Sequence, residues 1–171
     1  MSVLQILIHP DPRLKKVCEP VADPTGVCDL IADMVQTMYD APGIGLAAPQ
    51  IGVNARVLVM DCAGKDSAPE PMALINPEII DASEEVNEHE EGCLSIPEQY
   101  ALVTRPAEVT VRWTTPEGTP AERRFDGLWA TCVQHEIDHL NGRLFIDHLG
   151  TVKRQLITQK MKKLKRERAK A

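Results

Sequence analysis

The first clear pattern in the chain is a helical repeat of apolar residues in the stretch DLIADMVQTMYDAPG. The apolar positions recur three and four residues apart, at Leu30, Ile31, Met34, Val35 and Met38. This spacing places one apolar stripe along an α-helix, and a proline followed by a glycine ends such a helix. The sequence therefore predicts an amphipathic helix over residues 29–41 that stops before Pro42 and Gly43.

Short segments of a different kind follow this helix. Apolar and β-branched residues alternate or cluster over residues 55–61, 71–80, 102–113 and 121–126, with Pro, Gly and Asp between them. These features indicate β-strands. Helical spacing returns in GLWATCVQHEIDHLNG, which ends at Gly142, and a final helix is expected from about Thr151. Strands grouped between helices predict an α+β fold rather than an alternating α/β sheet.

Length and composition predict one domain in a reducing compartment. The 171 residues are 43% apolar, enough for a single core, and they contain no repeat or linker. The start, MSVLQILIHPDPRL, has no basic leader, and no segment has the apolar length of a membrane span, so we expect neither a targeting peptide nor a membrane anchor. Five irregularly spaced cysteines argue against a disulfide framework and favour the cytoplasm.

Charge divides the chain into two parts. The formal net charge is -6, but residues 151–171 carry nine Lys and Arg against the single Glu167. The remaining 150 residues carry ten basic and twenty-four acidic side chains. We therefore expect an acidic body at residues 1–150 and a basic C-terminal helix at 151–171, both within one domain, with different partners.

The stretch QHEIDHLNG contains the most suggestive chemistry. On a helix, His135 and His139 share a face, so two imidazoles can bind one metal ion while Glu136 lies beside them. The alternative is a surface helix with two histidines by chance. A structural zinc site usually has four protein ligands, whereas three leave a position for water and catalysis. The third ligand is therefore decisive.

Cys93 is the strongest candidate for the third ligand. It lies in EEGCLSIP, a separate segment in which Gly92 permits a close backbone approach. Cys132 precedes His135 by one turn, but three ligands from one straight helix spread too far along its axis for a compact tetrahedron. The other histidines and cysteines are more typical of surface or packing positions, namely His9, His89, His148, Cys18, Cys28 and Cys62.

Three motifs together resemble the peptide deformylase family: GIGLAAPQ at 43–50, EGCLS at 91–95 and QHEIDH at 134–139. The resemblance covers nearly the whole chain and implies antiparallel sheets around a central metal-binding helix. It implies removal of the formyl group from the N-terminal formylmethionine of new proteins, with Cys93, His135 and His139 as metal ligands and Glu136 as the base. It also implies ferrous iron as the working ion, with zinc, nickel or cobalt as possible replacements.

The resemblance further implies that Gln50 and the backbone N–H of Leu94 bind the oxyanion. Gly43 and Gly45 permit a tight loop whose backbone could pair with an extended peptide, and Gly45 and Gly92 are expected to bind substrate. GIGLAAPQ alone could be an ordinary turn, and a dinucleotide fingerprint is excluded because its glycines follow a helix instead of a strand.

The methionine pocket and the supporting residues are weaker predictions. Ile44, Leu128 and Thr131 could form a methionine pocket or could simply pack in the core. Glu91 and Asp138 are expected to support the metal-binding histidines, together with Arg105. Many relatives carry Arg where this chain has Tyr100, so contacts of that Arg with the downstream peptide are not expected here.

The basic C-terminal helix has an apolar stripe at Ile157, Met161 and Leu164, which predicts packing on the body. Its nine cations suggest binding to ribosomal RNA, since the expected substrates are nascent chains. Membrane binding is disfavoured because the stripe lacks large aromatic residues.

Two other functional classes remain as alternatives. One is a zinc peptidase, which shares the HExxH helix. The other is a non-enzymatic nucleic-acid module, which the acidic body and the missing fourth ligand disfavour.

Overall fold

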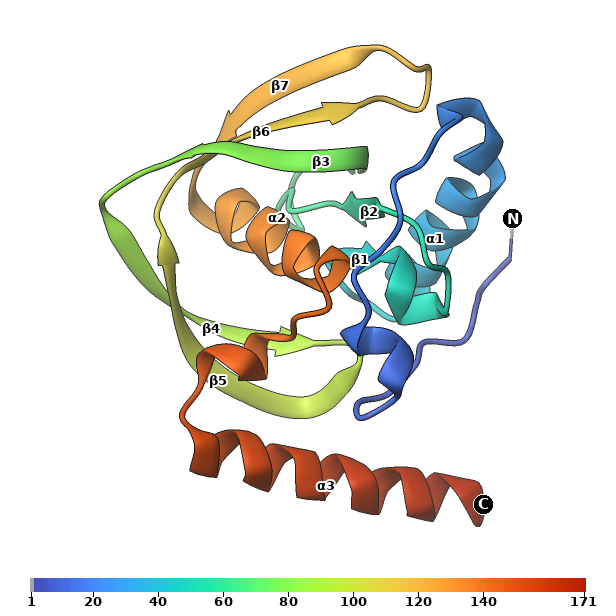
Figure 1. Ribbon diagram of the computed structural model, residues 1–171, viewed down its shortest axis with the longest axis vertical. Helices are drawn as coiled ribbons and strands as arrows, with labels where there is room; N and C mark the ends of the chain where they lie inside the picture. Colours follow the sequence, from blue (N-terminus) through green and yellow to red (C-terminus); the bar gives the residue numbers. More distant parts are fainter. Residues whose placement is uncertain (1) are drawn as a thin grey trace.

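A computed structural model of the protein describes residues 2–171 (Figure 1). It has three α-helices, α1 (Cys28–Asp40), α2 (Gly127–Leu140) and α3 (Thr151–Ala169). The strands are β1 (Gly45–Ala47), β2 (Val57–Met60), β3 (Met72–Ala82), β4 (Val86–Cys93), β5 (Ile96–Pro106), β6 (Val109–Thr114) and β7 (Pro120–Phe125). The predicted α+β class is confirmed. Within residues 2–171, no helix has both the length and the apolar character that crossing a membrane requires.

Two antiparallel sheets enclose α2. One has five strands in the order β1-β2-β3-β6-β7, and the other is the β4–β5 hairpin. Figure 1 shows α2 between the larger sheet and the hairpin, with α3 beyond β5. β1 pairs only with β2 and β4 only with β5 within the described residues, so each has one free edge. Both free-edged strands contribute residues to the same cavity.

The strand predictions were right for apolar segments and incomplete elsewhere. The expected strand at 102–113 is two strands, because the chain turns at Ala107 and Glu108. β4 was missed because its sequence, VNEHEEGC, is mostly charged and lacks apolar alternation. Its first five residues are exposed, so no buried face imposes that pattern. The three-residue β1 was also missed, since its glycine-rich sequence is typical of a loop.

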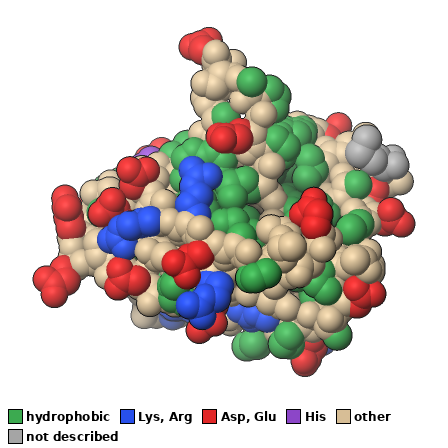
Figure 2. Space-filling view, turned by 90° about the horizontal axis from the view of Figure 1, so that it is seen from above, with side chains coloured by type: hydrophobic (Ala, Val, Ile, Leu, Met, Phe, Trp, Pro, Cys, Tyr) green, Lys and Arg blue, Asp and Glu red, His purple; other side chains and the backbone are tan. Residues whose placement is uncertain are grey.

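α3 packs on the body through its predicted apolar stripe. Ile157 and Met161 are buried in a cluster with Leu14, Ile96 and Phe145. Nε2 of His9 and Oγ1 of Thr158 lie 2.9 Å apart and form a polar link to the helix. Every lysine of α3 is exposed. By contrast, the face above β6 and β7 presents acidic and basic side chains near one another (Figure 2).

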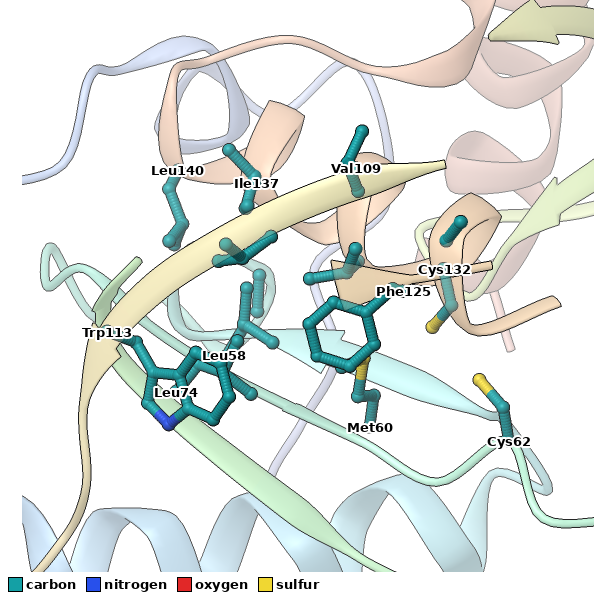
Figure 3. Packing of buried hydrophobic residues seen from close by; sticks show 14 of the residues in the cluster. Leu58, Met60, Cys62, Leu74, Val109, Trp113, Phe125, Cys132, Ile137 and Leu140 are labelled. Atoms are coloured by element: carbon teal, nitrogen blue, oxygen red, sulfur yellow. The ribbon is translucent and has the colours of Figure 1, made fainter. Parts of the chain in front are cut away.

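The main core fixes α2 against the five-stranded sheet. Buried side chains from β2, β3, β6 and β7 meet the inner face of the helix (Figure 3). Phe125 is 1% exposed, and its ring centroid lies 6.0 Å from that of Trp113, while Leu140 is fully buried. Cys18, Cys62 and Cys132 are buried as expected, but Cys28 is exposed at the start of α1. Burial of this core holds α2 rigidly, which positions the side chains on its opposite face.

Candidate active site and metal centre

The structure brings the three predicted ligands together. His135 and His139 come from α2, and Cys93 comes from the end of β4. One ligand atom from each lies within 4.8 Å of the other two, with Sγ of Cys93 3.3 Å from Nε2 of His139. Cys132 is not part of this group, and its Sγ lies 3.6 Å from the carbonyl oxygen of Ile44. The geometry therefore favours Cys93 over Cys132 as the sulfur ligand.

This donor set fits a small divalent cation. A thiolate and two imidazoles at these separations match three corners of a tetrahedron and leave the fourth for water or substrate. Burial lowers the pKa of His139 well below its usual range, which keeps the imidazole neutral and able to bind a metal. Nδ1 of His135 lies 2.9 Å from Oε1 of Glu91, leaving Nε2 to face the site. Zinc, iron, cobalt and nickel all suit such ligands.

Charged side chains behind His135 hold it in place, whereas Nδ1 of His139 has no hydrogen-bond partner among the described residues. Arg105 donates two hydrogen bonds to Glu91, at 2.7 and 3.0 Å, and a third at 2.9 Å to Asp138. Asp138 also lies 2.8 Å from Nε2 of His148. Burial alone would raise the pKa of Glu91, but hydrogen bonds from His135 and Arg105 lower it to about 2. Glu91 is therefore ionised at neutral pH and favours an N–H at Nδ1 of His135.

Glu136 lies next to the ligands without being one of them. It is 3% exposed, and Oε1 lies 3.8 Å from Nε2 of His135. Its other oxygen has no hydrogen-bond partner among the described residues. Burial raises the pKa of this carboxyl to about 7. A carboxyl group with that proton affinity can both accept and donate a proton near neutral pH.

Gln50 is oriented by bonds on both sides of its amide. Oε1 accepts from the backbone N–H of Ala47 at 2.9 Å, while Nε2 donates to Oγ of Ser95 at 3.1 Å and lies 3.6 Å from Sγ of Cys93. Ser95 therefore holds one amide N–H group, and the other points toward Cys93 at the metal site. Leu94 follows Cys93 and packs over the GIGLAAPQ loop, where a Cβ on Gly43 would lie only 2.7 Å from Leu94. No sequence signal pointed to the role of Ser95 in orienting Gln50.

A cavity of about 440 Å³ opens onto these groups. The predicted substrate residues Ile44, Gly45, Gly92, Leu128 and Thr131 all line it. Ile44 is 45% exposed and Leu128 is 39% exposed, which contradicts the alternative that they simply pack in the core.

Glycine is required at the inner wall of this cavity. A Cβ on Gly45 would lie 2.8 Å from Sγ of Cys132 and 3.0 Å from the carboxyl carbon of Glu136. The close approach of β1 to α2 therefore depends on the missing side chain. Several other residues that line the cavity were not predicted from the sequence, among them Glu90, Glu98 and Gln99.

A half-buried cysteine and two histidines beside an unpartnered carboxylate define a metal-dependent hydrolase site. Residues 3–155 match the family model for polypeptide deformylase, and the chain belongs to this family. Its members remove the formyl group from the N-terminal formylmethionine of newly synthesised proteins and release formate, and this is the reaction of the present chain.

Relatives and solved structures agree with this assignment over the full chain. A peptide deformylase of Rhizorhabdus wittichii is 51% identical over 174 residues, with 98% of each chain covered. A crystal structure of a peptide deformylase from Legionella pneumophila superposes with a TM-score of 0.90 at 45% identity, covering 99% of each chain. One from Ehrlichia chaffeensis in complex with actinonin has a TM-score of 0.91 at 39% identity, covering 97% of this chain and 99% of that one.

Proposed function

We propose that Glu136 is the general base and acid of the deformylation reaction, with Cys93, His135 and His139 holding the metal ion. The observation that supports this most strongly is the buried, unpartnered oxygen of Glu136 beside the three ligand atoms. A buried hydrogen-bond acceptor without a partner lowers the stability of the folded protein. Its presence beside the ligands therefore indicates a functional role. The carboxyl group is therefore available for a water molecule and a substrate amide.

An ion held by Cys93, His135 and His139 would supply Lewis acidity toward water and the formyl oxygen. Glu136 takes a proton from the water molecule while the water oxygen attacks the formyl carbon. The same carboxyl group then passes this proton to the amide nitrogen, because an amine leaves readily only when protonated. Nε2 of Gln50 and the backbone N–H of Leu94 donate hydrogen bonds to the developing oxyanion.

The thiolate ligand explains why a strong base is needed. The negative sulfur of Cys93 would cancel one unit of a bound ion's charge, so the ion would acidify water less than an ion bound by three imidazoles. Glu136 would supply this base beside the ion. We propose ferrous iron as the native ion, with zinc, nickel or cobalt able to replace it, since the ligands suit all four.

The cavity supports recognition of formylmethionine followed by any residue. Ile44, Leu128 and Thr131 provide a partly apolar wall for the methionine side chain. The free edges of β1 and β4 can pair with the backbone of an extended peptide, a mode that tolerates varied side chains. Nascent peptides that begin with formylmethionine are the substrates this arrangement suits.

We also propose that the chain acts in the cytoplasm and that α3 associates with the ribosome. The exposed lysines of α3 project away from the apolar stripe that anchors the helix. Phosphate groups of ribosomal RNA would attract these cations, and the attraction would weaken as salt rises.

Paired peptides test the proposed chemistry. Purified protein is incubated with formyl-Met-Ala-Ser and with Met-Ala-Ser bearing a free amine, and both formate and free methionine are measured. We expect formate release from the formylated peptide and no cleavage of a peptide bond in either peptide. Release of methionine from the free-amine peptide would instead indicate the zinc peptidase alternative.

A further inference from the structure

Two buried cysteines, Cys62 and Cys132, lie next to each other beside the active-site cavity. Cys62 follows β2 by two residues, and Cys132 belongs to α2. Both are free thiols in the main hydrophobic core. Figure 3 shows their sulfur atoms facing the same gap between α2 and the chain that follows β2. The reaction that the protein catalyses uses neither thiol.

Backbone contacts hold the two thiols near each other. Sγ of Cys132 lies 3.6 Å from the carbonyl oxygen of Ile44, and the same oxygen accepts the backbone N–H of Asp61 at 2.8 Å. Because Asp61 directly precedes Cys62, this carbonyl links α2 to the segment that carries the second thiol. Sγ of Cys62 in turn lies 4.0 Å from the carbonyl oxygen of Leu128, one turn before Cys132. Each thiol therefore lies against the element that carries the other.

The other three cysteines are not placed for such a pairing. The backbone N–H of Cys18 donates to the carbonyl of Leu140, two turns beyond Cys132 on α2. Cys28 is exposed at the start of α1, and Cys93 belongs to the group of metal ligands. Cys62 is thus the cysteine that can pair with Cys132.

Cys132 is the thiol that a small oxidant can reach first. It lines the active-site cavity, whereas Cys62 lies behind it. The adjacent Cys62 thiol and burial together raise the pKa of Cys132 well above its usual range. Little thiolate is therefore present at neutral pH, so the thiol reacts slowly and the pair stays reduced until oxidant persists.

We propose that Cys62 and Cys132 form a redox-sensitive pair that hydrogen peroxide converts to a disulfide, and that this disulfide reversibly lowers deformylase activity. The sulfur of Cys132 breaks the O–O bond of peroxide, giving a sulfenic acid and one water molecule. The sulfur of Cys62 then attacks the sulfenic acid, forming the S–S bond and releasing a second water. The two thiols lose two electrons and two protons in total, and one peroxide becomes two waters. A dithiol reductant reverses the bond by thiol–disulfide exchange, as expected for a redox-sensing pair in the cytoplasm.

The disulfide would disturb the inner wall of the cavity. A covalent bond draws two sulfurs closer than any nonbonded contact, so the side chain of Cys132 must shift. Its sulfur packs so closely under Gly45 that a Cβ there would lie 2.8 Å from it and 3.0 Å from the carboxyl carbon of Glu136. Movement at this wall therefore displaces β1 relative to Glu136. Since a misplacement of about 1 Å can slow an enzyme about 100-fold, we expect activity to fall by roughly tenfold or more.

Peroxide treatment of the full chain tests the proposal. The protein carries Cys28→Ala, which removes the exposed thiol that could join two copies, and it is loaded with zinc, an ion without redox chemistry. After peroxide is removed, disulfide-linked peptides are identified by mass spectrometry without reduction, and zinc content and formate release from formyl-Met-Ala-Ser are measured. We expect a cross-link between the peptides that contain Cys62 and Cys132, retained zinc, and roughly tenfold lower activity that dithiothreitol restores.

Variants assign the effect to this pair. Cys62→Ala in the same background should keep the basal activity and lose the reversible response to peroxide. Cys18→Ala is the matched control, because Cys18 is buried in the same core but lies near the other end of α2. This variant should respond to peroxide as the parent protein does.

Three results would overturn the redox pair. The first is peroxide-treated protein without the cross-link, including protein that loses zinc because Cys93 is oxidised instead. The second is a cross-link that leaves formate release unchanged. The third is the same reversible loss of activity in Cys62→Ala as in the parent protein.

Discussion

Oε1 of Glu91 lies 2.9 Å from Nδ1 of His135, the ring nitrogen that does not face the metal site. Arg105 holds the same carboxylate from the other side through two hydrogen bonds. Because the Glu91 carboxylate is ionised, it holds a proton on Nδ1 of His135, and a metal ion bound at Nε2 would take the place of the second proton that the raised pKa of this imidazole favours. Glu91 lies two residues before the ligand Cys93 on β4, and it orients a second ligand, His135, which belongs to α2.

Removing this carboxylate should weaken metal binding without removing a ligand. We expect Glu91→Ala to lower metal affinity about 10- to 100-fold, the usual effect of losing a partner behind a ligating histidine. Competition with a chelator, followed by metal analysis, measures the change. Glu88→Ala, on the exposed part of the same strand, is the control. Equal metal retention in both variants would show that Glu91 has no such role.

The two cysteines near the site should respond differently to substitution. Cys93→Ala should lose the metal and activity, since a ligand is removed. Cys132→Ala should retain the metal and cost about 1 kcal/mol or somewhat more of unfolding free energy, because it removes a buried packing group. Metal content and thermal unfolding are measured for both. Metal loss in the Cys132 variant, but not in the Cys93 variant, would reverse the assignment.

Deletion of residues 154–171 is expected to weaken ribosome association while sparing hydrolysis of short formyl-Met peptides. The structure adds that this deletion also removes the buried Ile157 and Met161, which should lower stability. Replacing the exposed Lys153, Lys160 and Lys163 by glutamine removes charge alone. Co-sedimentation with ribosomes at low and high salt should show weaker, less salt-dependent binding for this variant, and unchanged binding would count against the proposal.

The contact between His9 and α3 predicts a loss of stability in mild acid. Burial, reinforced by the nearby Lys15, lowers the pKa of His9 to about 4 from its usual 6.5. The unfolded chain therefore binds a proton that the folded chain excludes between these values. The contribution of His9 to the free energy of unfolding is complete above pH 6.5 and is lost as the pH falls toward 4.

Thermal unfolding between pH 7 and 4 measures this effect. His9→Gln keeps a polar group near Thr158 but cannot titrate, so its unfolding temperature should fall less steeply than that of the wild type across the interval. His89→Gln is the control, because His89 is exposed. The same slope for wild type and His9→Gln would mean that His9 does not cause the acid sensitivity.

The sequence was most informative where function or burial imposes a spacing. The i and i+4 histidines of α2 and the apolar stripes of α1 and α3 were predictable from helix periodicity. β4 was not, since its exposed, charged residues carry no period, although it supplies Cys93 and Glu91. Gln50 was identified only through family resemblance, and its orientation by Ser95 depends on a contact across forty-five positions of the chain.

The most direct test of the account is formate release by Glu136→Gln, measured together with metal content. Glutamine preserves the size of the side chain but cannot transfer a proton. The three ligands are untouched, so the variant should bind metal as the wild type does. Deformylation of formyl-Met-Ala-Ser should fall by roughly 10²- to 10⁴-fold, the range expected for loss of a general acid–base group. Near-normal formate release from a metal-loaded variant would contradict the assignment of Glu136 as the base.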